Sequence, residues 1–187
     1  MLTARLIREV ESAVNVGHQL VRQTHRQRSL SADGWERWHE ACAQLHAQCH
    51  PTDYLWERST LERIRSGDQE VIEDAILFLD VDPWFFRSGY LKEGLIRGLK
   101  RAPLAALQQR RLRHVVLKVC QGRNRREFRC YCSLGMKLWT PEFEDGVRAA
   151  VGAHDAESNH RFAHLLRYLE QGRLQYGERG RTNESMC

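Results

Sequence analysis

The chain has 187 residues, of which 42% are hydrophobic and 28% charged, and its formal net charge is +5. This length suits one sizeable domain, or one domain with a small appendage, and the composition excludes a largely disordered chain. No apolar run reaches about 18 residues, so we expect no membrane span. Arg5, Arg8 and Glu9 lie where the apolar core of a secretory signal would be, so we expect a cytoplasmic protein.

Charge is divided unevenly along the chain. Residues 1–94 hold 11 Lys and Arg against 15 Asp and Glu, whereas residues 95–187 hold 18 against 9. Residues 68–82 contain six acidic residues and no basic one, whereas residues 97–129 contain 11 basic residues and one acid, Glu127. Such polarity steers or orients a charged partner.

Apolar residues recur with the period of an amphipathic helix through almost the whole chain. We expect a first helix after an N-cap at Thr3. Further helices are expected at residues 35–49, 54–65, 69–79, 84–101, 104–121, 124–140, 142–151 and 157–171. Because no comparable segment alternates with period two, the sequence predicts an all-α protein without a sheet.

The turns between these helices carry start and stop residues. Asp82-Pro83 and Thr140-Pro141 both match an N-cap followed by a proline in the first helical turn. Gly94 lies inside a predicted helix, where glycine costs about 1 kcal/mol relative to alanine, so we expect a crowded neighbour beside it. Connections of a few residues favour antiparallel packing of successive helices.

Every second helix-breaking position, at Gly67, Pro103, Pro141 and Gly172, recurs after roughly 35 residues, as helix pairs do in repeat arrays. From Asp80 to Arg101 an acidic-proline turn leads into an amphipathic helix, and residues 67–172 thereby resemble a short HEAT-like repeat array. The resemblance implies antiparallel helix pairs stacked as a right-handed superhelix over residues 51–172. Residues 1–50 would then form a two-helix cap or subdomain, and residues 173–187 a flexible tail.

Aromatic residues crowd the start of the helix predicted at residues 84–101. Trp84, Phe85 and Tyr90, with Phe86 between them, are too bulky to be buried easily on one side of a helix. Exposed aromatic side chains often anchor protein interfaces, so Trp84, Phe85 and Tyr90 are candidate partner contacts. The alternative is that all of them fill gaps between neighbouring helices.

Basic residues form a second candidate surface. Those on the helix at residues 104–121 are Arg110, Arg111, Arg113 and Lys118. Those around the following turn are Arg123, Arg125, Arg126 and Arg129. Guanidinium groups bind phosphate oxygens in pairs, and they bind acidic protein surfaces equally well. We therefore assign Arg123, Arg125 and Arg126 to a protein partner, with a solvated polar face as the simplest alternative. Arg110, Arg111, Arg113, Lys118 and Arg129 would serve a nucleic-acid partner.

A row of histidines and cysteines is the weakest candidate site. His39, Cys42, His46 and His50 share one face of the helix at residues 35–49, and Cys49 lies beside them. The i, i+4 spacing can hold two metal ligands, but a closed site needs about four. We therefore expect no metal and no other cofactor, with the cysteines in the core. The six cysteines of the chain show no CxxC spacing, which indicates free thiols.

Motifs of catalysis, such as a phosphate-binding glycine loop, HExxH or a nucleophile elbow, are missing from the sequence. We therefore expect a non-enzymatic protein that binds one macromolecular partner by direct contact, as an inhibitor or adaptor. Compact HEAT-like proteins include toxin-neutralising immunity proteins, and the resemblance extends to that role by analogy. The alternative is a nucleic-acid-binding HEAT-like protein that uses the basic face of residues 97–129.

Overall fold

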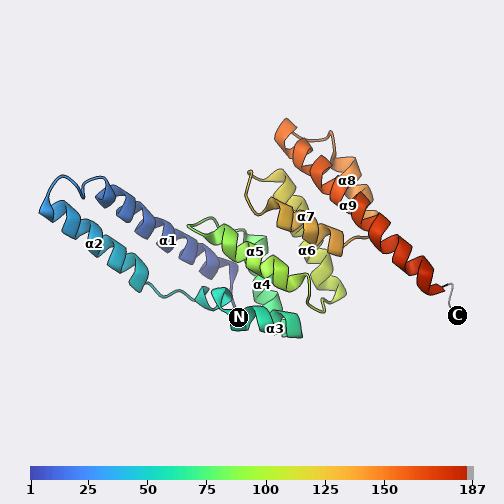
Figure 1. Ribbon diagram of the computed structural model, residues 1–187, viewed down its shortest axis with the longest axis horizontal. Helices are drawn as coiled ribbons and strands as arrows, with labels where there is room; N and C mark the ends of the chain where they lie inside the picture. The colour runs from blue at the N-terminus through green and yellow to red at the C-terminus, as the bar shows by residue number, and fades with distance from the viewer. Residues whose placement is uncertain (185–187) are drawn as a thin grey trace. The chain divides into compact units, whose positions relative to one another are not determined.

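The computed structural model describes residues 1–184, and of the side chains those of residues 1–173. Within residues 1–184 the chain forms nine α-helices and one short 3-10 helix, and none of these residues lies in a strand (Figure 1). The predicted all-α class is confirmed. The chain divides into two compact units, which we call unit 1 (residues 1–64 and 68–95) and unit 2 (residues 65–67 and those from 96 onward). The expected boundary after residue 50 does not coincide with this division.

Unit 1 contains the first, second and fourth helices and most of the third and the fifth. Their bounds are α1 Ala4–His25, α2 Ala32–Ala47, the 3-10 helix Asp53–Trp56, α3 Arg58–Ser66, α4 Gln69–Val81 and α5 Ser88–Leu99. Thr3 is the N-cap of α1, as predicted, and its hydroxyl accepts a hydrogen bond from the backbone N–H of Leu6. Helices α1 and α2 lie side by side (Figure 1).

Helix α4 is the centre of unit 1, because it is apolar on nearly every side. Ile72, Ile76 and Phe78 are fully buried. The one buried charge on this helix is Asp74, which accepts hydrogen bonds from Leu2 N at 2.7 Å and from Tyr54 Oη at 2.5 Å. These bonds stabilise the buried carboxylate and tie both ends of the first 74 residues together.

Unit 2 is built from α6 Ala106–Gln121, α7 Phe128–Lys137, α8 Pro141–Ala150 and α9 Ala156–Glu184. Helices α6, α7 and α8 all contact α9 (Figure 1). Their shared core consists of fully buried side chains, among them Val116, Leu134, Phe162, Leu165 and Leu169. The predicted start of α8 is confirmed, since Thr140 Oγ1 accepts from Phe143 N and Pro141 is in the first turn.

The prediction for Asp82-Pro83 was wrong. Asp82 ends α4 instead of starting α5, with a left-handed backbone (φ 55°) and its N–H donated to the Phe78 carbonyl. Helix α5 therefore begins at Ser88 rather than residue 84, and residues 82–87 form a loop. The crowded neighbour expected beside Gly94 is also absent among the described residues, because a Cβ there would meet no atom within 4 Å.

The chain end was predicted as a flexible tail over residues 173–187. Helix α9 continues through residue 184, and residues 185–187 lie outside the described residues, so that tail stays a prediction. None of the described helices is both long and apolar enough to traverse a lipid bilayer.

Candidate functional sites

The loop at residues 82–87, which we call the aromatic loop, is the most strained segment of unit 1. Asp82 and Arg87 are the two non-glycine residues with positive φ among those described, at 55° and 66°. Residues other than glycine adopt positive φ rarely and at a cost in free energy, so surrounding contacts must hold the loop in this conformation.

Helix α1 supplies those contacts from one face. Arg8 Nη2 donates to the carbonyl of Val81 at 2.6 Å, immediately before the loop. Within it, Trp84 N donates to Glu11 Oε1 at 2.6 Å, and Asn15 Nδ2 donates to the Trp84 carbonyl at 2.8 Å. The His18 ring lies against Phe86, with ring centroids 4.1 Å apart.

A buried ion pair fixes the start of the aromatic loop from the other side. Nζ of Lys92 on α5 lies 2.5 Å from Oδ1 of Asp82, and the Lys92 side chain is entirely inaccessible to solvent. The carboxylate that closes α4 therefore also compensates a charge in the core.

The loop turns some aromatic side chains outward and one inward. In the loop Trp84 and Phe86 are 44% and 59% exposed, and Tyr90 in the first turn of α5 is 55% exposed. Phe85 is buried and packs edge-on against Phe78, with centroids 6.3 Å apart. Phe85 therefore has little surface to offer a partner, contrary to its predicted role, and Phe86 takes its place among the exposed aromatic residues.

The basic residues predicted on the helix at residues 104–121 lie on α6 as expected. Arg110 and Lys118 are exposed, whereas Arg111 and Arg113 are half-buried. Arg113 Nη1 donates to the Leu138 carbonyl at 3.2 Å, so this guanidinium also supports the end of α7. Of the residues in the following turn, Arg123, Arg126 and Arg129 are exposed and Arg125 is buried.

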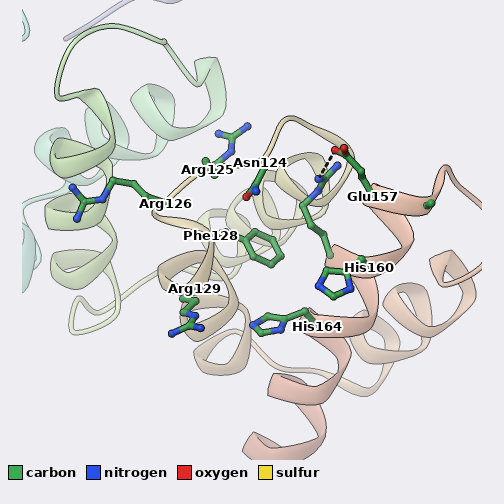
Figure 2. A pocket seen from close by; sticks show the side chains of 10 residues that line it. Asn124, Arg125, Arg126, Phe128, Arg129, Glu157, His160 and His164 are labelled. Atoms are coloured by element: carbon green, nitrogen blue, oxygen red, sulfur yellow. Dashed lines mark hydrogen bonds and ion pairs between the residues drawn. The ribbon is translucent and has the colours of Figure 1, made fainter.

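A pocket of about 570 Å³ lies between the start of α7 and the first turns of α9, and we call it the arginine-histidine pocket. The α7 side contributes Asn124, Arg125, Arg126, Phe128 and Arg129. The α9 side contributes Ala156, Glu157, His160, Arg161 and His164. Figure 2 shows the Phe128 ring pointing toward α9 and both histidine rings pointing toward α7, whereas Arg126 extends away from these rings. No protein-family model, curated protein or solved structure matches this chain.

Arg161 is a buried residue of the pocket wall. Its Nε donates to the Cys120 carbonyl at 2.8 Å, so a guanidinium on α9 satisfies one of the last carbonyl groups of α6. Nη2 donates to Ser158 Oγ at 3.2 Å, and Nη1 lies 3.5 Å from Oε2 of the exposed Glu157 (Figure 2). Arg161 is therefore held rigidly, with its charge only partly compensated.

The pKa of His164, in the same pocket, is lowered by burial and by nearby positive charges. These charges are those of Arg167, Arg129 and His160. Arg167 Nη2 lies 3.2 Å from His164 Nδ1. Because a guanidinium can only donate, Nδ1 must accept, and the proton of a neutral imidazole is then on Nε2. Nε2 is buried without a hydrogen-bond partner among the described residues.

The histidine and cysteine row on α2 does not come together as a metal site. His39 lies against Trp35, with ring centroids 4.4 Å apart, and Cys42 is half-buried. His46 is exposed and His50 half-buried, and Cys49 is exposed rather than in the core as predicted. Among the described residues there is no group of three or more His, Cys, Asp or Glu that could hold a metal ion.

The five cysteines that the structure describes are free thiols. Cys120 and Cys132 are buried in unit 2, and burial raises the pKa of each thiol to about 12. A thiol with such a pKa is a poor nucleophile near neutral pH. These two cysteines therefore belong to the core rather than to a reactive site.

Sequence reasoning missed the α9 side of the pocket. In the sequence, the apolar stripe of Phe162, Leu165 and Leu169 predicts the buried face of this helix. The pocket residues His160, Arg161 and His164 alternate with that stripe and were not interpreted as a site. The i, i+4 spacing of the two histidines was the available signal. Of the basic residues predicted around the turn, Arg125, Arg126 and Arg129 line the pocket and Arg123 does not, and their role in binding a partner stays a prediction.

Proposed function

We propose that this chain is a protein-binding module and that its aromatic loop contacts the partner. The observation that carries the proposal is a strained loop that is held by α1 while it exposes Trp84 and Phe86. Backbone strain persists where surrounding structure enforces it, and it concentrates at functional sites. Rigid aromatic anchors lose little conformational freedom on binding, which makes them efficient contacts.

The partner surface that this site fits is apolar at its centre and basic around it. The aromatic side chains require an apolar pocket, and residues 1–94 carry 15 acidic against 11 basic residues. Charge complementarity of this kind accelerates encounter and selects among partners. An inhibitor or adaptor, including a toxin-neutralising protein, would use such a surface. Stacking of antiparallel helix pairs, as in HEAT-like repeats, is part of the same proposal.

The test begins with a partner co-purified from the native cell and identified by mass spectrometry. Its affinity for recombinant wild-type chain is then compared with that for Trp84→Ala, Phe86→Ala and Trp56→Ala by calorimetry. Trp56 is the matched control, because it is also in unit 1 and is 44% exposed, the same fraction as Trp84. We expect the two loop variants to weaken binding about tenfold or more, as anchor residues do.

Equal affinity for the wild type and Trp84→Ala would remove the aromatic loop from the interface. An equal loss in Trp56→Ala would show that binding responds to general damage and not to the loop. Circular dichroism of each variant verifies that the helices are intact.

Nucleic-acid binding is the second candidate function, and one observation favours it. Arg110, Lys118 and Arg123 are all exposed, in a half of the chain that holds 18 basic against 9 acidic residues. An exposed surplus of cations attracts phosphate backbones without regard to sequence.

A further inference from the structure

We propose that the arginine-histidine pocket binds a small molecule that carries a phosphate monoester and is of about nucleotide size. The inference concerns unit 2 alone and does not depend on the protein-binding function proposed for the aromatic loop. It rests on the charge of the pocket, the arrangement of its arginines, and its volume.

Positive charge in the pocket exceeds negative charge. Four arginines line it, against one carboxylate, that of Glu157. The Glu157 side chain is 80% exposed and lies 3.5 Å from Arg161, which makes it a weak counter-charge. Arg129, on the rim, forms no ion pair within the described part of the chain. A concave site with this imbalance raises the local concentration of anions.

A structural role explains only part of this cluster. Arg161 satisfies the end of α6, and Arg125 is buried close to the same end, since its Nη2 would lie 2.9 Å from a Cβ on Gly122. Arg129 and His160 are exposed and have no comparable role. They are the exposed groups that can contact a ligand, in a pocket also lined by the buried Arg125 and Arg161.

Phosphate is the anion that this set of donors fits best. Guanidinium groups bind phosphate oxygens through two parallel hydrogen bonds, and a monoester dianion gains more from several cations than a carboxylate does. The cations surround one concavity, whereas binding along a nucleic-acid backbone needs a row of cations that follows successive phosphates. The arrangement thus favours a single terminal phosphate over a polymer.

The volume of the pocket indicates an organic group beyond the phosphate. Pockets for small molecules occupy about 300–1,000 Å³, and this one is about 570 Å³. The Phe128 and His164 rings, with centroids 5.8 Å apart and planes tilted by 41°, form part of its wall between α7 and α9 (Figure 2). Such rings accommodate a flat or apolar substituent.

The test uses adenosine monophosphate, adenosine and inorganic phosphate as probes on the whole chain at low, matched ionic strength. Binding is followed by calorimetry and by the imidazole C–H signals in proton NMR, assigned through His160→Gln and His164→Gln. We expect saturable binding of adenosine monophosphate, weaker competition by inorganic phosphate, and no binding of adenosine. The shifted signals should be those of His160 and His164.

Arg129→Gln is the decisive variant, because Arg129 is exposed and its replacement leaves the core intact. It should weaken binding about tenfold, the effect of losing one charged hydrogen-bond donor. Arg110→Gln is the matched control, with the same change of charge on α6 outside the pocket.

Three outcomes would overturn the proposal. Equal weakening by Arg110→Gln would indicate diffuse electrostatic attraction. Binding of adenosine as tight as that of adenosine monophosphate, or no saturation at millimolar concentrations, would show that the phosphate is not recognised. Stronger competition by an oligonucleotide without a terminal phosphate would assign the pocket to nucleic-acid backbones instead. None of these results bears on the aromatic loop, so the two proposals fail independently.

Discussion

Asp82 ends α4 with φ of 55°, and its carboxylate lies 2.5 Å from the ammonium group of Lys92. Asparagine tolerates the left-handed region as well as aspartate does, so Asp82→Asn removes the charge without adding backbone strain. The Lys92 side chain has no exposed surface, so its charge would then be compensated less well in the core.

We therefore expect Asp82→Asn to lower the free energy of unfolding by about 3 kcal/mol, as breaking a buried ion pair does. Urea denaturation measures the change. Asp33→Asn is the control, because Asp33 pairs with Arg37 on the surface, where an ion pair contributes less than about 1 kcal/mol. The double variant Asp82→Asn/Lys92→Met should recover part of the lost stability. A loss no larger than that of Asp33→Asn would show that the buried pair does not stabilise unit 1.

At the scale of the helices, two glycine positions differ in the space that they leave for a side chain. Gly94 lies within α5, and a Cβ at this position would have no atom within 4 Å, whereas a Cβ on Gly34 of α2 would lie 2.3 Å from the carbonyl oxygen of Gln27. A backbone oxygen cannot move away as a flexible side chain can.

Gly94→Ala should raise the free energy of unfolding by about 1 kcal/mol, because alanine restricts the unfolded chain and favours the helix. Gly34→Ala should lower it by about 2 kcal/mol through overpacking. Thermal unfolding followed by circular dichroism compares the two. Changes of the same sign would contradict the packing described for one of these helices.

Two turns with the same sequence pattern show what could be predicted from the sequence at this scale. Thr140-Pro141 starts α8 as predicted, because its hydroxyl caps a helix that begins immediately. Asp82-Pro83 was predicted in the same way, yet Asp82 ends α4 in the left-handed region and its carboxylate pairs with Lys92 instead of capping a helix. The local pattern predicted that a helix follows, but not that it begins only at Ser88.

The pocket could not be predicted for a related reason. The basic turn around Arg125 and Arg129 is evident in the sequence, yet Arg161 and His164 join it only because α9 contacts α7. Helical periodicity gives the face of each helix that is buried, and not which helix it meets.

For the whole molecule, the uneven division of charge allows the nucleic-acid alternative to be tested. Because the pocket concentrates its cations in one place, we expect no retention of duplex DNA at physiological salt in a mobility-shift assay. Retention that falls steeply with salt and is lost in Arg123→Glu/Arg126→Glu would favour the alternative. Arg22→Glu/Arg26→Glu, two exposed changes in unit 1, controls for the same change of net charge.

Arg8, Glu11, Asn15 and His18 are spaced three or four residues apart, so they form one line along α1 beneath residues 81–86. The contacts of these four residues fix the conformation of the loop before any partner binds. A partner would then meet a ready-made surface, and the speed of complex formation would be limited by collision and orientation rather than by rearrangement of the loop.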